Sequence, residues 1–187
     1  MKRRSFLTAV ASVVPAVAVS DLSIAQAHAQ APAPPDSREP HVVGSGEDRS
    51  GKSHSLGFST ILFKVTAAET EGQLFLMEHQ QMKPGGSPNL HLHLNPDEWF
   101  YVIDGEVAFQ VGEQRLDPHA GESVLAPRLV PHTFASVGPT PGRMLIGFRP
   151  AGKMEQFFID GSDPNPPKRS PGFYETRDIG PSPFWKP

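Results

Sequence analysis

Three histidines and one glutamate carry the clearest chemical signal in this sequence. His91, His93 and Glu98 lie in the stretch NLHLHLNPDEWFYVIDG, whose leucines, aromatic residues and β-branched residues are otherwise typical of buried strands. Because side chains alternate between the faces of a strand, His91 and His93 point the same way, about 7 Å apart along the backbone. His132, which begins the alternating segment HTFASV, is the candidate for a third imidazole. Neutral imidazoles and a carboxylate suit one divalent transition metal, which could be Fe, Mn, Ni, Cu, Co or Zn.

Short strands separated by turn residues must position these side chains. The predicted strands occupy residues 59–66, 73–82, two segments of 89–105 broken at 95–97, and then 106–111, 114–117, 122–126, 132–137, 143–148 and 154–159. The turn at 95–97 is expected to fold the strand of Glu98 back alongside that of the two histidines. Asp104 and Gly105 are expected to close a hairpin. Since no apolar stripe of helical period extends over three turns, the prediction is an all-β sandwich or closed barrel.

The spacing of these residues resembles the two motifs of the cupin superfamily. Gly85, His91, His93, Glu98 and Gly105 fit G(X)5HXH(X)4E(X)6G at every position. Gly121, Pro127 and His132 fit the first half of G(X)5PXG(X)2H(X)3N, but Leu129 replaces its second glycine and Ser136 its asparagine. Leu129 suggests a different backbone path before His132, and Ser136 affects only local barrel closure.

The chain looks most like single-domain, quercetin-dioxygenase-like cupins. That resemblance implies a jelly-roll β-barrel in which His91, His93, Glu98 and His132 hold the metal at the mouth. It also implies homodimers formed by sheet extension, for which residues 41–58 are the candidate segment. Without the conjunction of these motifs, each histidine would be read as a hydrogen-bonded core residue and Glu98 as a solvated carboxylate.

Aromatic and apolar side chains are expected to surround the ion. The predicted pocket-lining residues are His79, Met77, Phe100, Phe109 and Phe134. The strand pattern leaves two orientations open for His79, which either lines the pocket or faces outward. If it faces inward, it is a candidate for proton transfer. His119 lies in a turn and is expected to be exposed.

Four protein ligands leave open positions on the ion, and its net positive charge favours an enolate or phenolate. The resemblance to quercetin-dioxygenase-like cupins and the expected aromatic pocket favour a dioxygenase that acts on a small enolisable or phenolic substrate, such as a flavonol or diketone, with O2 as the candidate second substrate. Glu98 is its predicted catalytic base. The alternatives are an isomerase, lyase or decarboxylase that uses the ion as a Lewis acid, and a non-catalytic binder of a small molecule or metal.

The N-terminus predicts export to the periplasm or secretion. Residues 1–29 combine a basic start, a short apolar run and small-residue cleavage sites, and Arg3-Arg4 followed by Ser5-Phe6-Leu7 resembles a twin-arginine signal. An ordinary secretory signal is the alternative. The apolar run is too short for a stable membrane anchor. Residues 30–57 are predicted to be a Pro-rich leader and approach segment, and residues 58–160 the barrel. Residues 161–187 are predicted to be a Pro-rich tail without regular structure. The sequence leaves open whether this tail packs on the barrel or is disordered.

Composition excludes other classes of function. The 187-residue chain contains no cysteine, so disulfides and thiolate metal sites are excluded. Cleavage after Ala29 would leave 14 basic and 19 acidic residues, a net charge of −5. With no basic run in the remaining chain, nucleic acid is not an expected partner.

Overall fold

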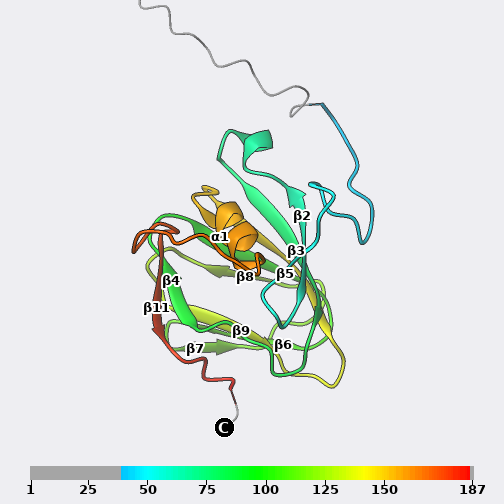
Figure 1. The fold of residues 1–187 in the computed structure, drawn as a ribbon. Helices are drawn as coiled ribbons and strands as arrows, with labels where there is room; N and C mark the ends of the chain where they lie inside the picture. The colour runs from blue at the N-terminus through cyan, green and yellow to red at the C-terminus, as the bar shows by residue number, and fades with distance from the viewer. Residues whose placement is uncertain (1–38, 186–187) are drawn as a thin grey trace, which may run out of the picture. The chain divides into compact units, whose positions relative to one another are not determined.

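The computed structural model describes residues 39–185 (Figure 1). The predicted export signal at 1–29 and residues 30–38 of the predicted leader therefore lie outside the described residues. Within the described residues, no helix has the length and apolar character needed to cross a membrane.

The described chain is built almost entirely of strands. They are β1 (His54–Ser55), β2 (Thr60–Val65), β3 (Phe75–Met82), β4 (Leu90–His93), β5 (Asp97–Asp104), β6 (Val107–Val111), β7 (Gln114–Leu116), β8 (Ser123–Ala126), β9 (His132–Ser136), β10 (Gly142–Arg149) and β11 (Thr176–Gly180). One α-helix, α1 (Met154–Gly161), follows β10, and a short 3-10 helix spans Ala68–Thr70.

Two antiparallel sheets form the jelly roll. Six strands are ordered β1-β2-β3-β10-β5-β8, and five are ordered β11-β4-β9-β6-β7. The prediction of an all-β barrel is confirmed, and the predicted strands between residues 59 and 148 all form. The hairpin predicted at Asp104 and Gly105 is wrong, because β5 pairs with β10 and β8 while β6 pairs with β9 and β7. That turn carries the chain from one sheet to the other.

A second crossing between the two sheets separates β4 from β5. The turn at 95–97 does not fold β5 back beside β4, as the sequence suggested, because the two strands belong to opposite sheets. Alternation along β5 buries Glu98, Phe100 and Val102 between the sheets and turns Trp99 and Tyr101 outward. Glu98 therefore reaches the barrel interior from the wall opposite the histidines.

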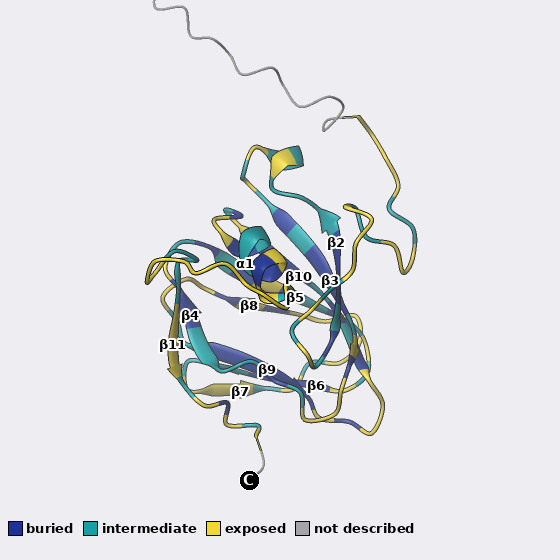
Figure 2. Cartoon of the chain, viewed as in Figure 1, coloured by how far each residue is buried: buried dark blue, intermediate teal, exposed yellow. Residues whose placement is uncertain are grey.

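Apolar side chains fill the space between the sheets. Several of the largest are less than 2 % exposed: Phe63, Phe75, Phe100, Phe109, Phe148, Met77, Met144 and Ile146. Burial of each contributes about 1.5–3 kcal/mol relative to an exposed side chain. In Figure 2 the buried colour follows β9, whose five residues are all buried.

Two predictions for the C-terminal part are wrong. Residues 154–159 were expected to form a strand, but they lie in α1, where Met154, Phe157 and Phe158 face the barrel at positions i, i+3 and i+4. The tail was expected to lack regular structure, but Thr176–Gly180 forms β11 and pairs with β4 (Figure 1). Beyond β11, Trp185 donates its indole N–H to the carbonyl of Ser87. The tail therefore packs on the barrel.

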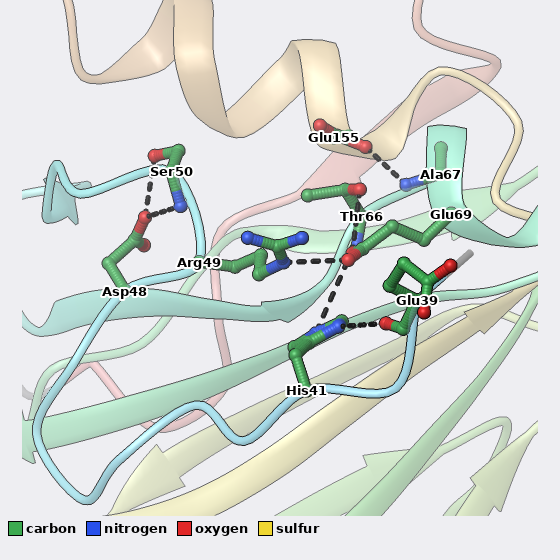
Figure 3. Close-up of polar contacts among 9 residues, drawn as sticks. All are labelled: Glu39, His41, Asp48, Arg49, Ser50, Thr66, Ala67, Glu69 and Glu155. Atoms are coloured by element: carbon green, nitrogen blue, oxygen red, sulfur yellow. Dashed lines mark hydrogen bonds and ion pairs between the residues drawn. The ribbon is translucent and has the colours of Figure 1, made fainter. Parts of the chain in front are cut away.

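A polar network fixes the described N-terminal segment to the barrel (Figure 3). Arg49 and His41 both contact the Glu69 carboxylate, at 2.6 and 3.3 Å. Glu155 of α1 accepts the backbone N–H of Ala67 at 2.6 Å. These contacts join residues 39–50, the 3-10 turn and the helix.

Candidate metal centre

The four residues singled out by the sequence meet inside the barrel. His91 and His93 lie on β4, and His132 on β9 is the registered partner of His91 across the five-stranded sheet. Glu98 comes from β5 of the six-stranded sheet. One nitrogen or oxygen atom from each of the four lies within 4.8 Å of all the others.

Main-chain carbonyls set the orientation of two imidazoles. Nδ1 of His91 lies 2.8 Å from the carbonyl of Asn89, and Nδ1 of His132 lies 2.9 Å from that of Val130. A carbonyl oxygen only accepts, so each Nδ1 carries the proton and donates it. Nε2 of both rings is thereby directed to the centre, as metal-binding histidines require.

The side chains of His93 and His132 both contact the carboxylate of Glu98. Its Oε2 lies 2.8 Å from Nε2 of His93 and 2.7 Å from Nε2 of His132, and all three side chains are nearly fully buried. The His93 ring also packs edge-on against Phe148, with 5.4 Å between ring centroids.

Burial and these contacts shift the ionisation of the centre. Burial opposes the charge on Glu98, but hydrogen bonds and charge from His132 and His93 outweigh it and hold the pKa of Glu98 well below its usual range. Burial acts to lower the pKa of His132, yet its contacts with Glu98 and Val130 raise it. Burial and the nearby His132 lower the pKa of His91 to about 4, against the attraction of Glu98.

The donor set fits one divalent transition metal. Ligand bonds to such ions are about 2.1 Å long, so two ligands on opposite sides lie about 4.2 Å apart. The observed 4.8 Å spread needs an adjustment of only a few tenths of an ångström per side chain. Three imidazoles and one carboxylate without a cysteine suit Fe, Mn, Ni, Cu, Co or Zn.

The centre opens into a cavity of about 380 Å³. Its wall contains His91, His93 and Glu98 together with Leu56, Phe58, His79, Pro88, Asn89, Phe134, Ile146, Phe148, Met154, Phe157, Phe158, Thr176 and Asp178. Aromatic and aliphatic side chains dominate this wall, which suits a flat or apolar organic molecule.

The predicted pocket residues divide into two groups. His79 and Phe134 border the cavity, so the inward orientation of His79 is the one that the structure shows. Met77, Phe100 and Phe109 are buried in the core and do not border this cavity. They face inward as alternation requires and pack in the hydrophobic core. His119 is exposed, as expected.

Sequence reasoning missed the cavity walls contributed by the chain ends. Phe157 and Phe158 come from α1, Thr176 and Asp178 from β11, and Leu56 from beside β1. The spacing of Met154, Phe157 and Phe158 was the available signal for an inward helical face. No comparable signal marked β11, which is polar and half exposed.

The departure of Leu129 from the motif suggested a different backbone path before His132, but the structure does not show one. The φ of Leu129 is +65°, in the left-handed region that glycine favours, and its N–H donates to the carbonyl of His93 at 2.8 Å. The turn therefore keeps the conformation that glycine would adopt, and it ties β4 to the segment before β9.

Residues 78–148 match the family model described as a cupin domain, and they span β3 to β10 with all four site residues. The barrel is a cupin fold. An RmlC-like cupin from Shewanella frigidimarina superposes with a TM-score of 0.51 at 19% identity, covering 63% of this chain and 98% of that one.

Two further proteins to which this chain is similar carry descriptions from polyketide chemistry. A protein described as polyketide synthase CurC, from Streptomyces cyaneus, is 26% identical over 115 residues, which cover 62% of this chain and 73% of that protein. The polyketide cyclase RemF from Streptomyces resistomycificus superposes with a TM-score of 0.54 at 17% identity, covering 78% and 89% of the two chains. At that identity the structural likeness shows the fold alone.

Proposed function

We propose that this protein is an exported, metal-dependent cupin enzyme whose substrate is a small enolisable or phenolic molecule, and that its reaction is a dioxygenation of the quercetin-dioxygenase type. The observation that carries the proposal is the three-histidine, one-glutamate cluster at the wall of an aromatic cavity. A polar centre with open positions binds the acidic oxygen, and the apolar wall binds the rest of the molecule.

The four side chains would hold one divalent transition metal. That ion would supply positive charge for an enolate or phenolate and, if redox-active, electrons for dioxygen chemistry. Phe134, Phe148 and Phe158 border the cavity and offer flat surfaces for a planar ring.

Glu98 would take the proton that the substrate loses on enolisation. Its contacts with His93 and His132 keep it ionised, so it is present as a carboxylate. The same contacts make it a weak base, since they stabilise the charged form. Once Nε2 of His93 and of His132 bind the ion, neither can donate to Glu98, so proton transfer to Glu98 would require its carboxylate to leave the ion.

A non-oxidative reaction is the second candidate. The 26% identical relative is described as a polyketide synthase, and polyketides are rich in enolisable carbonyl groups. The same centre would then act only as a Lewis acid, in ring closure, isomerisation, cleavage or decarboxylation.

Oxygen consumption separates the two candidates. The metal-loaded protein is mixed with flavonols and with β-diketones, in air and under anaerobic conditions. Dioxygenation requires oxygen uptake in proportion to product, whereas product formed without oxygen supports the second candidate. Ligand binding with no turnover in either condition would contradict both and support a non-catalytic binder.

Variants of the centre test the assigned roles. His132→Ala should abolish metal binding and leave a folded barrel, with a stability change of about 1–3 kcal/mol from desolvation of the partners left behind. Glu98→Gln should retain metal more weakly and lose turnover. Metal content by elemental analysis, unfolding and turnover are measured together, and a fully active Glu98→Gln protein would place proton abstraction elsewhere.

A further inference from the structure

His79 borders the cavity without belonging to the metal cluster. It lies on β3, is 1 % exposed, and is surrounded by aromatic rings. Phe134 and Phe158 meet it edge-on at centroid distances of 5.9 and 6.1 Å, and Phe58 lies 6.1 Å away. Packing on several sides fixes the plane of the imidazole.

Ser59 anchors one nitrogen of this ring, and the other nitrogen has no partner among the described residues. Nδ1 lies 3.0 Å from Oγ of Ser59, which is itself buried. Nε2 is buried and has no hydrogen-bond partner among the described residues. A buried polar atom left unpaired destabilises a folded protein, so its retention calls for a compensating role.

We propose that His79 is a substrate-positioning residue whose Nε2 hydrogen-bonds a second oxygen of the substrate, away from the metal centre. The inference rests on the function proposed above, because it assumes that an enolisable or phenolic molecule occupies the cavity. It narrows the substrate class to planar molecules that carry a further hydroxyl or carbonyl group beyond the oxygen held at the centre.

The Ser59–His79 pair can serve either kind of oxygen. When the serine hydroxyl donates to Nδ1, the proton resides on Nε2, which then donates to a carbonyl. When Nδ1 donates to the hydroxyl oxygen, Nε2 accepts from a phenol or enol. Burial lowers the pKa of His79 to about 4, against a smaller opposing effect of Glu98. The ring therefore stays neutral near pH 7, where both arrangements are available.

Matched flavonols test this assignment by binding rather than turnover. The parent probe is 3-hydroxyflavone, whose hydroxy-ketone pair can bind the metal. The comparison probes each add one hydroxyl, at the 6, 7, 3′ or 4′ position. Affinities are measured anaerobically by flavonol fluorescence with metal-loaded wild type and with His79→Phe, which keeps an aromatic ring but removes both nitrogens.

At least one hydroxylated probe should bind wild type about tenfold more tightly than the parent, and His79→Phe should erase that advantage. Tenfold corresponds to about 1.4 kcal/mol, within the range for one hydrogen bond to a buried group. Affinity for the parent should change less than twofold. His79→Gln, which restores a polar side chain, should recover part of the preference.

His54→Phe is the matched control. His54 also has a buried Nε2 without a partner and stacks on Phe63 at 4.1 Å, but it does not border the cavity. This control should preserve the preference of the wild type. Ser59→Ala provides an independent variant should His79→Phe fail to fold, and it should weaken the preference by removing the hydrogen-bond partner of Nδ1.

The outcomes separate this inference from the proposed function. If 3-hydroxyflavone binds only with metal but His79→Phe and Ser59→Ala keep the full preference, or wild type shows none, the role of His79 is refuted and the proposed function stands. If wild type binds no flavonol, the substrate class is wrong and the role of His79 falls with it. Equal losses for parent and hydroxylated probes would mean that His79 is structural only.

Discussion

At the scale of single residues, the centre depends on backbone atoms two positions before two of its histidines. Asn89 and Val130 supply the carbonyls that hold the rings of His91 and His132. Their own side chains play no part in that contact. The turns before β4 and β9 are thus parts of the centre, because a rotated carbonyl would turn the ligand nitrogen away.

Leu129 is the clearest case of local strain near the centre. A left-handed conformation costs a residue with a Cβ about 1–2 kcal/mol, whereas the greater chain entropy lost by glycine costs about 0.5–1 kcal/mol. Because Leu129 is 60% exposed, its side chain contributes little burial. Leu129→Gly should therefore stabilise the protein by about 0.5–1 kcal/mol, measured by urea unfolding.

Leu125→Gly provides the control for this prediction. Leu125 is similarly exposed, at 57%, but it lies on strand β8 and is not among the residues with positive φ. Its replacement should destabilise the protein, since glycine weakens a strand. Equal destabilisation by both changes would contradict strain at Leu129.

The candidate ligands were predictable from the sequence, but the wall that holds Glu98 was not. Alternation places His91 and His93 on one face whatever the pairing of β4, so their convergence depends on local geometry alone. The position of Glu98 depends on which sheet receives β5. A four-residue strand followed by Asn95-Pro96 is compatible with either a hairpin or a crossing, and only long-range pairing with β10 and β8 decides between them.

At the scale of elements, Asp160 joins α1 to the tail. Its carboxylate accepts hydrogen bonds from Arg169 and Tyr174, both at 2.7 Å, and from Gln156 at 2.6 Å. This anchor precedes β11, which brings Thr176 and Asp178 to the cavity wall.

Acid should loosen this anchor. Arg169 lowers the pKa of Asp160 to about 2, against a smaller effect of desolvation and with help from Tyr174 and Gln156. A carboxyl group with a lowered pKa in the folded state stabilises the fold fully above its unfolded value near 3.8, and that contribution is lost as pH falls from about 4 to 2. Asp160→Asn should lower the melting temperature at pH 7 and flatten its decline between pH 4 and 2.

The exposed Asp163 provides the control for the predicted pH dependence between pH 4 and 2. Asp163→Asn should leave the pH dependence of thermal unfolding close to that of wild type. If the melting temperature of the Asp160→Asn protein falls between pH 4 and 2 as steeply as that of wild type, other carboxyl groups govern acid sensitivity.

The misassigned C-terminal elements share one cause. An eight-residue helix has room for only two turns, so its apolar residues cannot repeat often enough to distinguish it from a strand. None of the five residues of β11 is buried, and the strand forms because β4 presents an edge at which it can pair. Both depend on the finished barrel rather than on local propensity.

At the scale of the whole molecule, the jelly roll itself was the most predictable feature. Strand patterning, frequent turns and paired motifs agree with one another over residues 59–148, and such agreement is what specifies a fold. The cavity was less predictable because its wall combines the barrel with Leu56, α1 and β11. Side chains from segments outside the motifs thus decide what the centre can bind.

The predicted export route leads to an expectation about the metal. A twin-arginine substrate crosses the membrane already folded, so the ion would be acquired in the cytoplasm. Cu and Zn outcompete Mn and Fe for nitrogen and oxygen ligands by affinity alone. Protein folded in the cytoplasm should therefore contain Mn, Fe or Ni, and protein directed to fold in the periplasm should contain Cu or Zn.

Elemental analysis of the purified protein from the two routes provides the measurement. A barrel lacking the centre through His132→Ala serves as the control for metal bound elsewhere. Identical metal content from both routes would argue against selection by the folding compartment.

The placement of the centre across the barrel has a mechanical consequence. His132 and Glu98 belong to different sheets, and they face each other across the interior. An ion bound by both side chains would therefore link the two sheets. Separation of the sheets would pull these side chains apart and release the ion, and a bound ion would oppose that separation.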